Sequence, residues 1–265
     1  MSGTFWIVGC GNMGGAMLRG WVDAGLDPAM VTVIDPGAPM VPAGVTIVAY
    51  PPEGVPDTVM IAVKPQMLGL VAPQIAPYLA AHTQLLSILA GVEVGTLRDH
   101  FGAPDTIVRV MPNTPAAIRK GVLALFSDSQ DGSALAEIEA LMAPLGLVEW
   151  IGEERMFDAV TALSGSGPAF LFRFIDALGQ AGSALGLPAD QAARFALATV
   201  EGAALLATAS DESPFALAER VASPGGSTRK GLDVLDQDGA LVALLTKTLI
   251  AAERRNAEMA ATARG

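Results

Sequence analysis

The stretch that decides the fold is "FWIVGCGNMGGAM", residues 5–17. An apolar run is followed by glycines at positions 9, 11 and 14 and then by a helical stretch. In such a turn the first glycine permits the sharp bend, the second lets a phosphate approach the backbone, and the third lets helix and strand pack closely. Gly9, Gly11 and Gly14 therefore predict a strand–turn–helix unit whose helix N-terminus, with Asn12 and Met13, faces a phosphate.

Asp35 supplies a second, separate indication of the same site. It ends the apolar run "VTVID", 35 − 14 = 21 residues past Gly14. An acidic side chain at the end of a second strand suits the ribose hydroxyls of a dinucleotide. The alternative is an ordinary strand–helix turn followed by a surface aspartate. Strand, spacing and acid together favour a dinucleotide site, and because "DPGAP" offers no basic side chain for a 2′-phosphate, Asp35 favours NADH over NADPH.

The two halves of the chain differ in their pattern of apolar residues. Up to about residue 150, continuous apolar runs ("TFWIVG", "MVTVID", "VTIVAY", "TVMIAVK", "QLLSILAG", "TIVRVM" and "GVLALF") alternate with helical stretches at about 13–25, 66–81 and 93–101. Runs without alternation are typical of strands buried on both faces of a parallel sheet. The predicted fold is α/β: a Rossmann-type doubly wound parallel sheet over residues 1–155 and an all-helical dimerisation domain over residues 156–265.

Several of the predicted C-terminal helices are apolar nearly all round, for example between Phe195 and Ala209. A helix without a polar face is buried, and so small a bundle cannot bury every such helix by itself. We therefore expect this half of the chain to associate with a second copy.

Composition limits the classes of partner. The net charge is −11, which disfavours nucleic acid and anionic membranes as partners. No stretch resembles a membrane-spanning helix or a signal peptide. The single cysteine, Cys10, excludes an intrachain disulfide and is simplest to place in the reducing cytoplasm. With one cysteine and two histidines, the chain is not expected to form a zinc site of thiolate or imidazole ligands.

The histidines bear on the chemistry as well. His82 precedes the strand "QLLSILA", away from the carboxyl ends of the strands where ligands bind, and His100 ends a helix. Neither position suits the proton donor of a 2-hydroxy-acid dehydrogenase. A β-hydroxyacid dehydrogenase is disfavoured too, because the helix after "LSGSGPAF" (163–170) carries Arg173 and no lysine.

Other polar or glycine-containing segments do follow predicted strands: "AVKP" (62–65), "LAG" (89–91) and "MPNTP" (111–115). They are candidates for the nicotinamide half of a cofactor site, through Val63, Lys64, Pro65, Ala90, Gly91 and Asn113. For Lys64 the alternative is an ion pair with a helix carboxylate, and for "NTP" it is a simple turn.

A second glycine loop, "SPGGSTRKGLDVLD" (223–236), interrupts the helical half. Gly225 and Gly226 allow successive backbone N–H groups to converge, and a helix that begins near Ser227 directs its positive end to the same point. Ser223 and Thr228 add hydroxyl donors, so the loop predicts a carboxylate site. The alternative is that Ser227 or Thr228 merely caps the helix.

Five motifs, "GCGNMGGAM", "AVKP", "MPNTP", "LSGSGPAF" and "SPGGSTRKGLDVL", in this order, resemble those of pyrroline-5-carboxylate reductases, over residues 5 to about 255. The resemblance implies NAD(P)H-dependent reduction of the cyclic imine pyrroline-5-carboxylate to L-proline, the last step of proline biosynthesis. It implies an obligate homodimer that can assemble into a larger ring. It also implies that the amides of Gly226 and Ser227 hold the carboxylate, while the Thr228 hydroxyl lies near the imine nitrogen.

Two residues depart from the pattern expected of that family. Leu89 stands where a smaller residue is expected and could narrow the cofactor channel, and Asp35 disagrees with the usual preference for NADPH. Two alternatives remain: a reductase of a related cyclic imine acid, and a dinucleotide-binding sensor without turnover, against which the intact "PGGST" loop argues.

Overall fold

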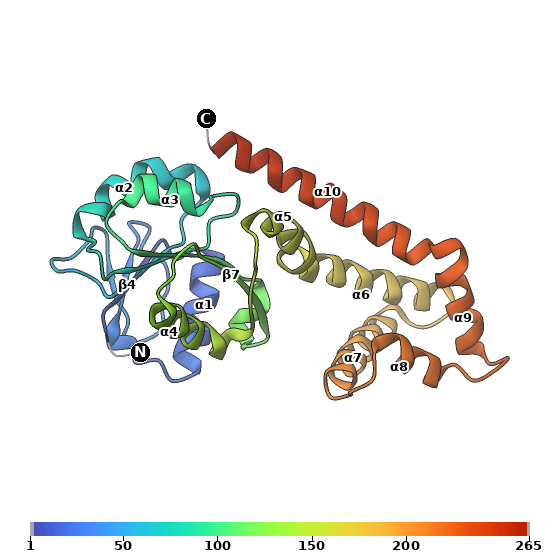
Figure 1. Ribbon diagram of the computed structural model, residues 1–265. Helices are drawn as coiled ribbons and strands as arrows, with labels where there is room; N and C mark the ends of the chain where they lie inside the picture. Colours follow the sequence, from blue (N-terminus) through green and yellow to red (C-terminus); the bar gives the residue numbers. More distant parts are fainter. Residues whose placement is uncertain (1–2, 264–265) are drawn as a thin grey trace. The chain divides into compact units, whose positions relative to one another are not determined.

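The computed structural model describes residues 3–263, with the side chains of residues 3–258. By its contacts the chain forms two compact units (Figure 1). The first comprises the chain up to Ser166 together with the segment from Ala252 onward, and the second is Gly167–Ala251. The functional boundary at residue 155 remains a prediction, whereas the contacts group residues 156–166 with the first unit.

The first unit is built on one eight-stranded sheet in the order β3-β2-β1-β4-β5-β6-β7-β8. The strands are β1 (Phe5–Val8), β2 (Val31–Ile34), β3 (Thr46–Val48), β4 (Thr58–Ile61), β5 (Gln84–Ser87), β6 (Thr106–Met111), β7 (Gly121–Phe126) and β8 (Gly146–Trp150). The strand order reverses between β1 and β4, which is the switch point where doubly wound sheets bind ligands. The predicted Rossmann-type sheet is confirmed.

Two features of the sheet were not expected. Strand β7 runs antiparallel to β6, because only residues 112–120 connect the two strands and a parallel partner needs a longer crossover. Strand β8 pairs parallel to β7, although its segment was not among the predicted strands. Its residues alternate between half-buried and exposed, so it lacks the continuous buried apolar run of the central strands.

Helices cover both faces of the sheet (Figure 1). On one face lie α1 (Asn12–Asp23) and α4 (Gly132–Met142), and on the other lie α2 (Leu68–Ile75) and α3 (Val94–Phe101). The three predicted helical stretches correspond to α1, to α2 with its flanking 3₁₀ turns, and to α3. Each face has its own buried core, as a sheet that is apolar on both sides requires.

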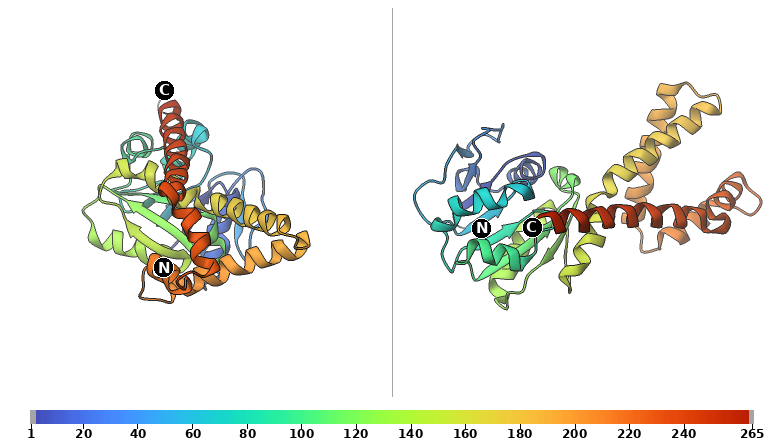
Figure 2. Two further views of the ribbon diagram at one scale, coloured as in Figure 1. Left: turned by 90° about the vertical axis from the view of Figure 1, so that its right-hand side faces the viewer. Right: turned by 90° about the horizontal axis from the view of Figure 1, so that it is seen from above.

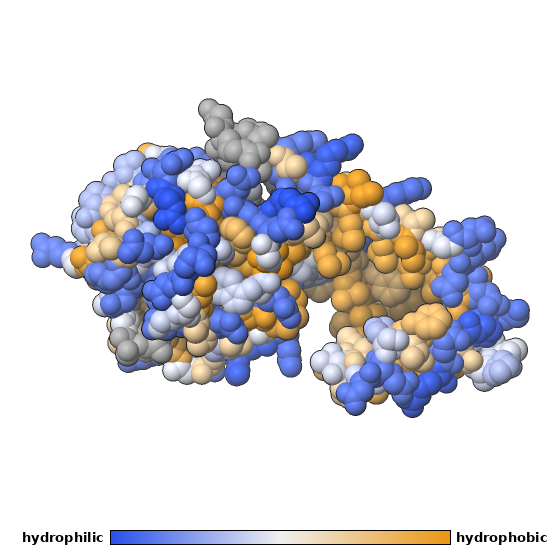
Figure 3. All heavy atoms as spheres, in the orientation of Figure 1, coloured by the Kyte–Doolittle hydropathy of each residue, from blue (hydrophilic) through white to orange (hydrophobic). Residues whose placement is uncertain are grey.

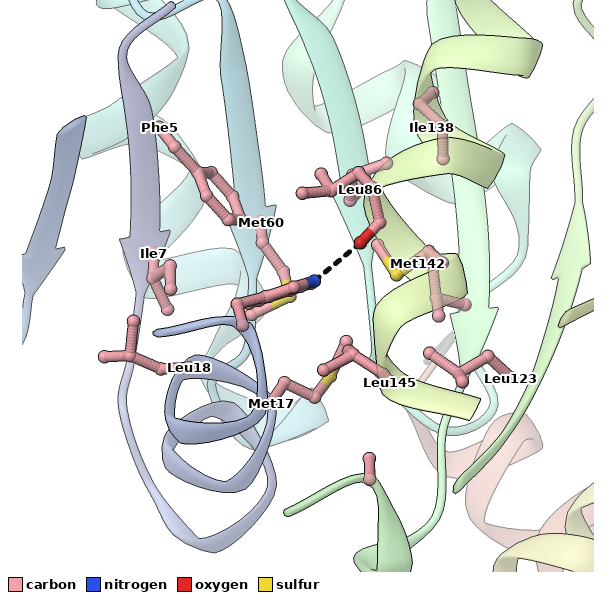
Figure 4. Close-up of a cluster of buried hydrophobic side chains, with 14 of the residues drawn as sticks. Phe5, Ile7, Met17, Leu18, Met60, Leu86, Leu123, Ile138, Met142 and Leu145 are labelled. Carbon is pink, nitrogen blue, oxygen red and sulfur yellow. Dashed lines mark hydrogen bonds between the residues drawn. The ribbon is translucent and has the colours of Figure 1, made fainter. Parts of the chain in front are cut away.

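The core under α1 and α4 is the one that positions the glycine turn. Phe5 and Ile7 of β1 pack there with Met17 and Leu18 of α1 (Figure 4). Trp21 donates its indole N–H to the carbonyl of Leu141 at 2.7 Å, which ties α1 to α4. The strand and the helix that flank the turn are therefore both anchored in the same buried cluster.

The second unit is helical, as predicted. It contains α6 (Gly167–Ala184), α7 (Ala189–Thr208), α8 (Pro214–Val221), α9 (Ser227–Asp236) and the first part of α10 (Ala240–Ala263). Helices α6 and α7 form a close hairpin (Figure 2), in which a Cβ on Gly179 would lie 3.3 Å from Cα of Ala193. None of the described helices has both the length and the apolar run that a membrane crossing would need.

Many large apolar side chains of this unit are exposed in the single chain. Figure 3 shows hydrophobic side chains gathered along α6 and α10. The exposed apolar side chains of the unit include Leu171, Phe172 and Phe174 of α6, Phe195, Leu197, Leu205 and Leu206 of α7, and Val242, Leu244 and Ile250 of α10. So large an apolar surface is typical of an association interface.

Gly20 provides a test of how closely α1 packs against the segments that carry Ala116 and Leu145. A Cβ there would lie 2.6 Å from the carbonyl oxygen of Ala116 and 2.7 Å from Cδ2 of Leu145. We expect Gly20→Ala to lower the free energy of unfolding by about 1–3 kcal/mol, the usual cost of overpacking. Urea titration followed by tryptophan fluorescence measures this, since Trp6, Trp21 and Trp150, the three tryptophans, all lie in the first unit. Gly95→Ala is the matched control, because its Cβ would meet nothing within 4 Å, and it should leave stability unchanged or slightly higher.

Candidate functional site

The glycine turn between β1 and α1 has the geometry that a phosphate-binding turn requires. Gly9 has a φ of +84°, and a Cβ on it would lie 2.8 Å from Cγ1 of Val63. A Cβ on Gly14 would lie 3.0 Å from the carbonyl oxygen of Gly9, so helix and turn are in close contact. Over Gly11, by contrast, nothing lies within 4 Å of a Cβ position. The space is open where a pyrophosphate would approach.

The N-terminus of α1 is free to bind an anion. Its N-cap is Gly11, which provides no side-chain hydrogen bond, and its first turn contains no acidic residue. The first N–H groups of a helix have no partner within the helix, and they carry the positive end of its dipole. The residues of this turn, including Asn12 and Met13, therefore fit the phosphates of a dinucleotide.

Asp35 lies against the same turn. Its Oδ2 accepts the backbone N–H of Cys10 at 2.9 Å, and its Oδ1 accepts that of Gly37 at 2.8 Å. The carboxylate thus fixes the turn to the end of β2. A carboxylate offers about four acceptor positions, so capacity remains for ribose hydroxyls.

Cys10 is buried within the turn. Burial raises the pKa of its thiol, the negative charge of Asp35 raises it further, and the charge of Arg19 opposes both. Burial and Asp35 therefore both disfavour the thiolate, which is the nucleophilic form of cysteine.

The other predicted cofactor segments follow β4, which pairs with β1, and β5, which pairs with β4. Val63, Lys64 and Pro65 come after β4, and Ala90 and Gly91 come after β5. Parallel neighbours end at one edge of the sheet, so these segments lie at the same edge as the glycine turn. Lys64 is exposed and forms no ion pair with the described side chains, so the alternative of a helix carboxylate partner is not seen. Leu89 does not narrow this edge, because its side chain is buried in the core under α2 and α3.

Asn113 is more constrained than its motif indicated. Its side chain is buried, its Oδ1 accepts the N–H of Val122 at 2.9 Å, and its Nδ2 donates to the carbonyl of Ser164 at 3.0 Å. The amide therefore joins β7 to the segment "LSGSG". That segment forms a π-helix, Thr161–Gly165, a feature frequent at functional sites. Cofactor contact by Asn113 remains a prediction, and it would use the second amide N–H.

The sequence did not single out Arg109, although a lone arginine in the apolar run "TIVRVM" was a visible signal. Arg109 is buried in β6 and donates to Oε1 of Glu154 at 2.8 Å. The central carbon of its guanidinium lies 4.4 Å from the centroid of the Phe157 ring. The same Glu154 oxygen accepts the N–H of Val94 at 2.8 Å, at the start of α3. The pair anchors the chain just before the π-helix.

In the second unit, the loop between α8 and α9 has an open helix N-terminus. Gly226 is the N-cap of α9 and no side chain caps the helix, so Ser227 or Thr228 is not acting as the cap. Gly225 has a φ of +73°, which glycine adopts without strain. Ser227 and Thr228 are exposed in the first turn.

One detail of this loop differs from the expectation for its amides. The N–H of Gly226 donates to the carbonyl of Ser223 at 3.0 Å and so closes a turn rather than pointing outward. Ser223 Oγ lies beside Gly226, where a Cβ would come within 2.6 Å of it. An ion pair of 2.7 Å between Arg229 and Glu219 ties α9 to α8 and holds the loop ends together.

A doubly wound unit with an open glycine turn at its switch point, together with a helical unit, is the arrangement of a nicotinamide-dependent oxidoreductase. Within residues 3–258, no group of three or more His, Cys, Asp or Glu side chains is placed to hold a metal ion. The family model for pyrroline-5-carboxylate reductase dimerisation matches residues 154–259, and that for NADP oxidoreductase, coenzyme F420-dependent, matches residues 4–91.

Whole-chain relatives agree with the family models. The pyrroline-5-carboxylate reductase of Pseudomonas aeruginosa is 37% identical over 261 residues, covering 96% of this chain and 95% of its own. The structure of that of Coxiella burnetii is 31% identical, with a TM-score of 0.86 over 97% of this chain and 98% of its own. That of Plasmodium falciparum, with NADP bound, is 25% identical, with a TM-score of 0.82 over 98% of each chain. The chain belongs to the pyrroline-5-carboxylate reductase family.

Asn113 offers a test of whether the polar cross-link holds the site together. Asn113→Ala leaves the Val122 N–H and the Ser164 carbonyl without their partner, at about 1–3 kcal/mol for each buried group. We expect urea denaturation to show this loss. Asn113→Asp keeps an acceptor for the Val122 N–H but places a buried carboxylate against the Ser164 carbonyl, so at neutral pH it should lower stability as well. Unchanged stability in both variants would contradict the cross-linking role.

Proposed function

We propose that this protein reduces 1-pyrroline-5-carboxylate to L-proline with NAD(P)H, the last step of proline biosynthesis. The observation that carries the proposal is the uncapped N-terminus of α9, with Thr228 exposed in its first turn, in a chain of this family. That arrangement provides what a small cyclic imine carboxylate needs: converging N–H donors for the carboxylate and a hydroxyl for the ring nitrogen.

The carboxylate would bind at the N-terminus of α9. Ser227 supplies a first-turn amide, Gly225 gives the loop its conformation, and the Ser223 hydroxyl lies beside it. Local donors are needed because the net charge of −11 repels an anionic substrate at long range. Gly226 would contribute through its conformation, and through its amide only if the bond to Ser223 opens.

The reaction makes modest demands on the chain. The glycine turn would hold NAD(P)H, which would supply a hydride to the imine carbon, and the protonated ring nitrogen would keep its proton in the amine product. A protonated imine is already electrophilic, so the protein has mainly to position it and exclude water. The Thr228 hydroxyl would orient the ring nitrogen. This agrees with a site that uses neither His82 nor His100.

The remaining assignments follow from this function. Cofactor binding would use Gly9, Gly11, Asn12, Met13, Gly14 and Asp35 at the turn, with Val63, Lys64, Pro65, Ala90, Gly91 and Asn113 at the neighbouring strand ends. Residues 1–155 would form the cofactor domain, and residues 156–265 the substrate and dimerisation domain. The helical unit associates with other copies, and we propose a homodimer that can assemble into a ring of dimers. A reducing cytoplasm suits its single free cysteine.

Thr228 is the residue that tests the mechanism. Losing a hydrogen bond to a charged group costs about 1.5–3 kcal/mol, so Thr228→Ala should lower kcat by about 10- to 100-fold. Steady-state oxidation of NAD(P)H with pyrroline-5-carboxylate measures this, and fluorescence titration should show cofactor affinity unchanged. Thr228→Ser keeps the hydroxyl and should retain most of the activity. An unchanged rate in the alanine variant would remove Thr228 from the mechanism.

Asp35 tests the cofactor preference. Its carboxylate should accept hydroxyl hydrogen bonds from the ribose of NADH and repel a 2′-phosphate. We expect Asp35→Asn to lower the ratio of kcat/KM for NADH to that for NADPH by about tenfold, roughly 1.4 kcal/mol. Separate assays with the two cofactors measure the ratio. If the ratio did not move while both values fell together, Asp35 would act only by holding the turn.

A further inference from the structure

Arg19 lies near the glycine turn but contacts none of the candidate site residues through a hydrogen bond or an ion pair. It is exposed on α1, one helical turn after Gly15. Its guanidinium Nη1 lies 3.3 Å from the position of a Cβ on Gly15, so the side chain runs back over that glycine toward the start of the helix. Side chains on a helix lean toward its N-terminus, and the absence of a Cβ at Gly15 leaves the guanidinium room to do so.

At this position Arg19 has no bonded anion within residues 3–258, because the oxygens of Asp35 accept from backbone amides. A cation near a helix N-terminus opposes the dipole of its own helix. Among the side chains that the structure describes, none forms a hydrogen bond or an ion pair with Arg19, and no acidic residue lies in the first turn of α1. Other arginines of the first unit, such as Arg98 with Asp128 and Arg109 with Glu154, do have side-chain partners.

Arg19 lies on the side of the turn that faces Asp35. The same Gly15 Cβ position is 3.7 Å from Sγ of Cys10, and the amide of Cys10 is bonded to Asp35. Arg19 and Asp35 shift the pKa of the Cys10 thiol in opposite directions, so both charges act across this one residue. The end of β2, where Asp35 lies, is where the ribose next to adenine binds in doubly wound folds.

We propose that Arg19 binds the 2′-phosphate of NADPH, so that Asp35 and Arg19 act on the same ribose in opposite directions. The proposal rests on the proposed function of the glycine turn as a dinucleotide site. A planar guanidinium donates two parallel hydrogen bonds to a phosphate, and the residue is free to turn toward one. The protein then accepts NADPH despite Asp35, with a preference set by the balance of the two side chains.

The test measures binding rather than turnover. Calorimetric titration of the full chain with NADPH, NADH and 2′,5′-ADP gives dissociation constants for the protein and for Arg19→Gln. We expect Arg19→Gln to raise the dissociation constants of NADPH and 2′,5′-ADP by about 10- to 100-fold, the range for loss of a hydrogen bond to a charged group. The dissociation constant of NADH should change by less than about twofold. Arg19→Lys, which keeps the charge but not the planar fork, should recover part of the loss.

Arg98→Gln is the matched control. It removes the same charge from the same unit, but from α3 on the opposite face of the sheet, where Arg98 pairs with exposed Asp128. All three dissociation constants should stay unchanged in this variant. Urea denaturation of each variant shows that the fold is intact.

Three results would overturn the proposal. If Arg19→Gln raised the dissociation constants of NADH and NADPH equally, the guanidinium would bind the pyrophosphate instead. Unchanged affinity for NADPH and 2′,5′-ADP would show that Arg19 contacts neither. If the unmodified protein bound no dinucleotide, the glycine turn itself would fail as the cofactor site. This last result would contradict the proposed function as well, whereas the first two leave it standing.

Discussion

The interaction on which the first unit depends is the pair of hydrogen bonds that Asp35 accepts from the amides of Cys10 and Gly37. Charge-assisted bonds of this kind are stronger than those between neutral groups. They fix the glycine turn to the end of β2, while the core around Phe5 and Trp21 fixes the strand and the helix that flank it. The direction of α1, and with it the point at which its first N–H groups converge, follows from these two anchors. A carboxylate that could serve a ribose is thus also part of the frame that forms the site.

On the other side of the switch point, polar side chains also fix loops to the sheet. Asn113 and the Arg109–Glu154 pair connect β6, β7 and the start of α3 to the segment that leads into the π-helix. Buried polar groups are costly unless each finds a partner, and no described side chain leaves a buried nitrogen or oxygen unpaired. Because such pairs are directional, they fix where "MPNTP" and "LSGSG" meet more narrowly than apolar packing would. The two motifs belong together because one satisfies the carbonyl of the other.

How much of this was predictable depends on the kind of signal. Continuous apolar runs predicted the parallel strands, and glycine spacing predicted the turn, because both reflect local requirements of the backbone. Strand β8 was missed because its half-exposed residues lack that run, and the antiparallel β7 because direction depends on the length of a connection. The engagement of Asn113 could not be foreseen, since its partner Ser164 is distant in sequence and is chosen by the folded geometry. The bond of the Gly226 amide to Ser223 is local, and the residues Pro224 and Gly225 between them favour such a turn. The motifs located the candidate residues but did not separate those that bind from those that hold the frame.

Both candidate binding loops use the same physical device, one in each unit: a glycine-rich loop that leads into an uncapped helix N-terminus. The reason lies in the charge balance of the chain. With 16 basic and 27 acidic residues, a surface field cannot attract an anion, and most basic side chains are already paired with carboxylates. Backbone N–H groups cannot be neutralised in this way, so they remain available to a dinucleotide at α1 and to a carboxylate at α9. Arg19 stands out for a different reason: among the described arginines it is one of the few without an ion pair, and it lies beside such a helix N-terminus.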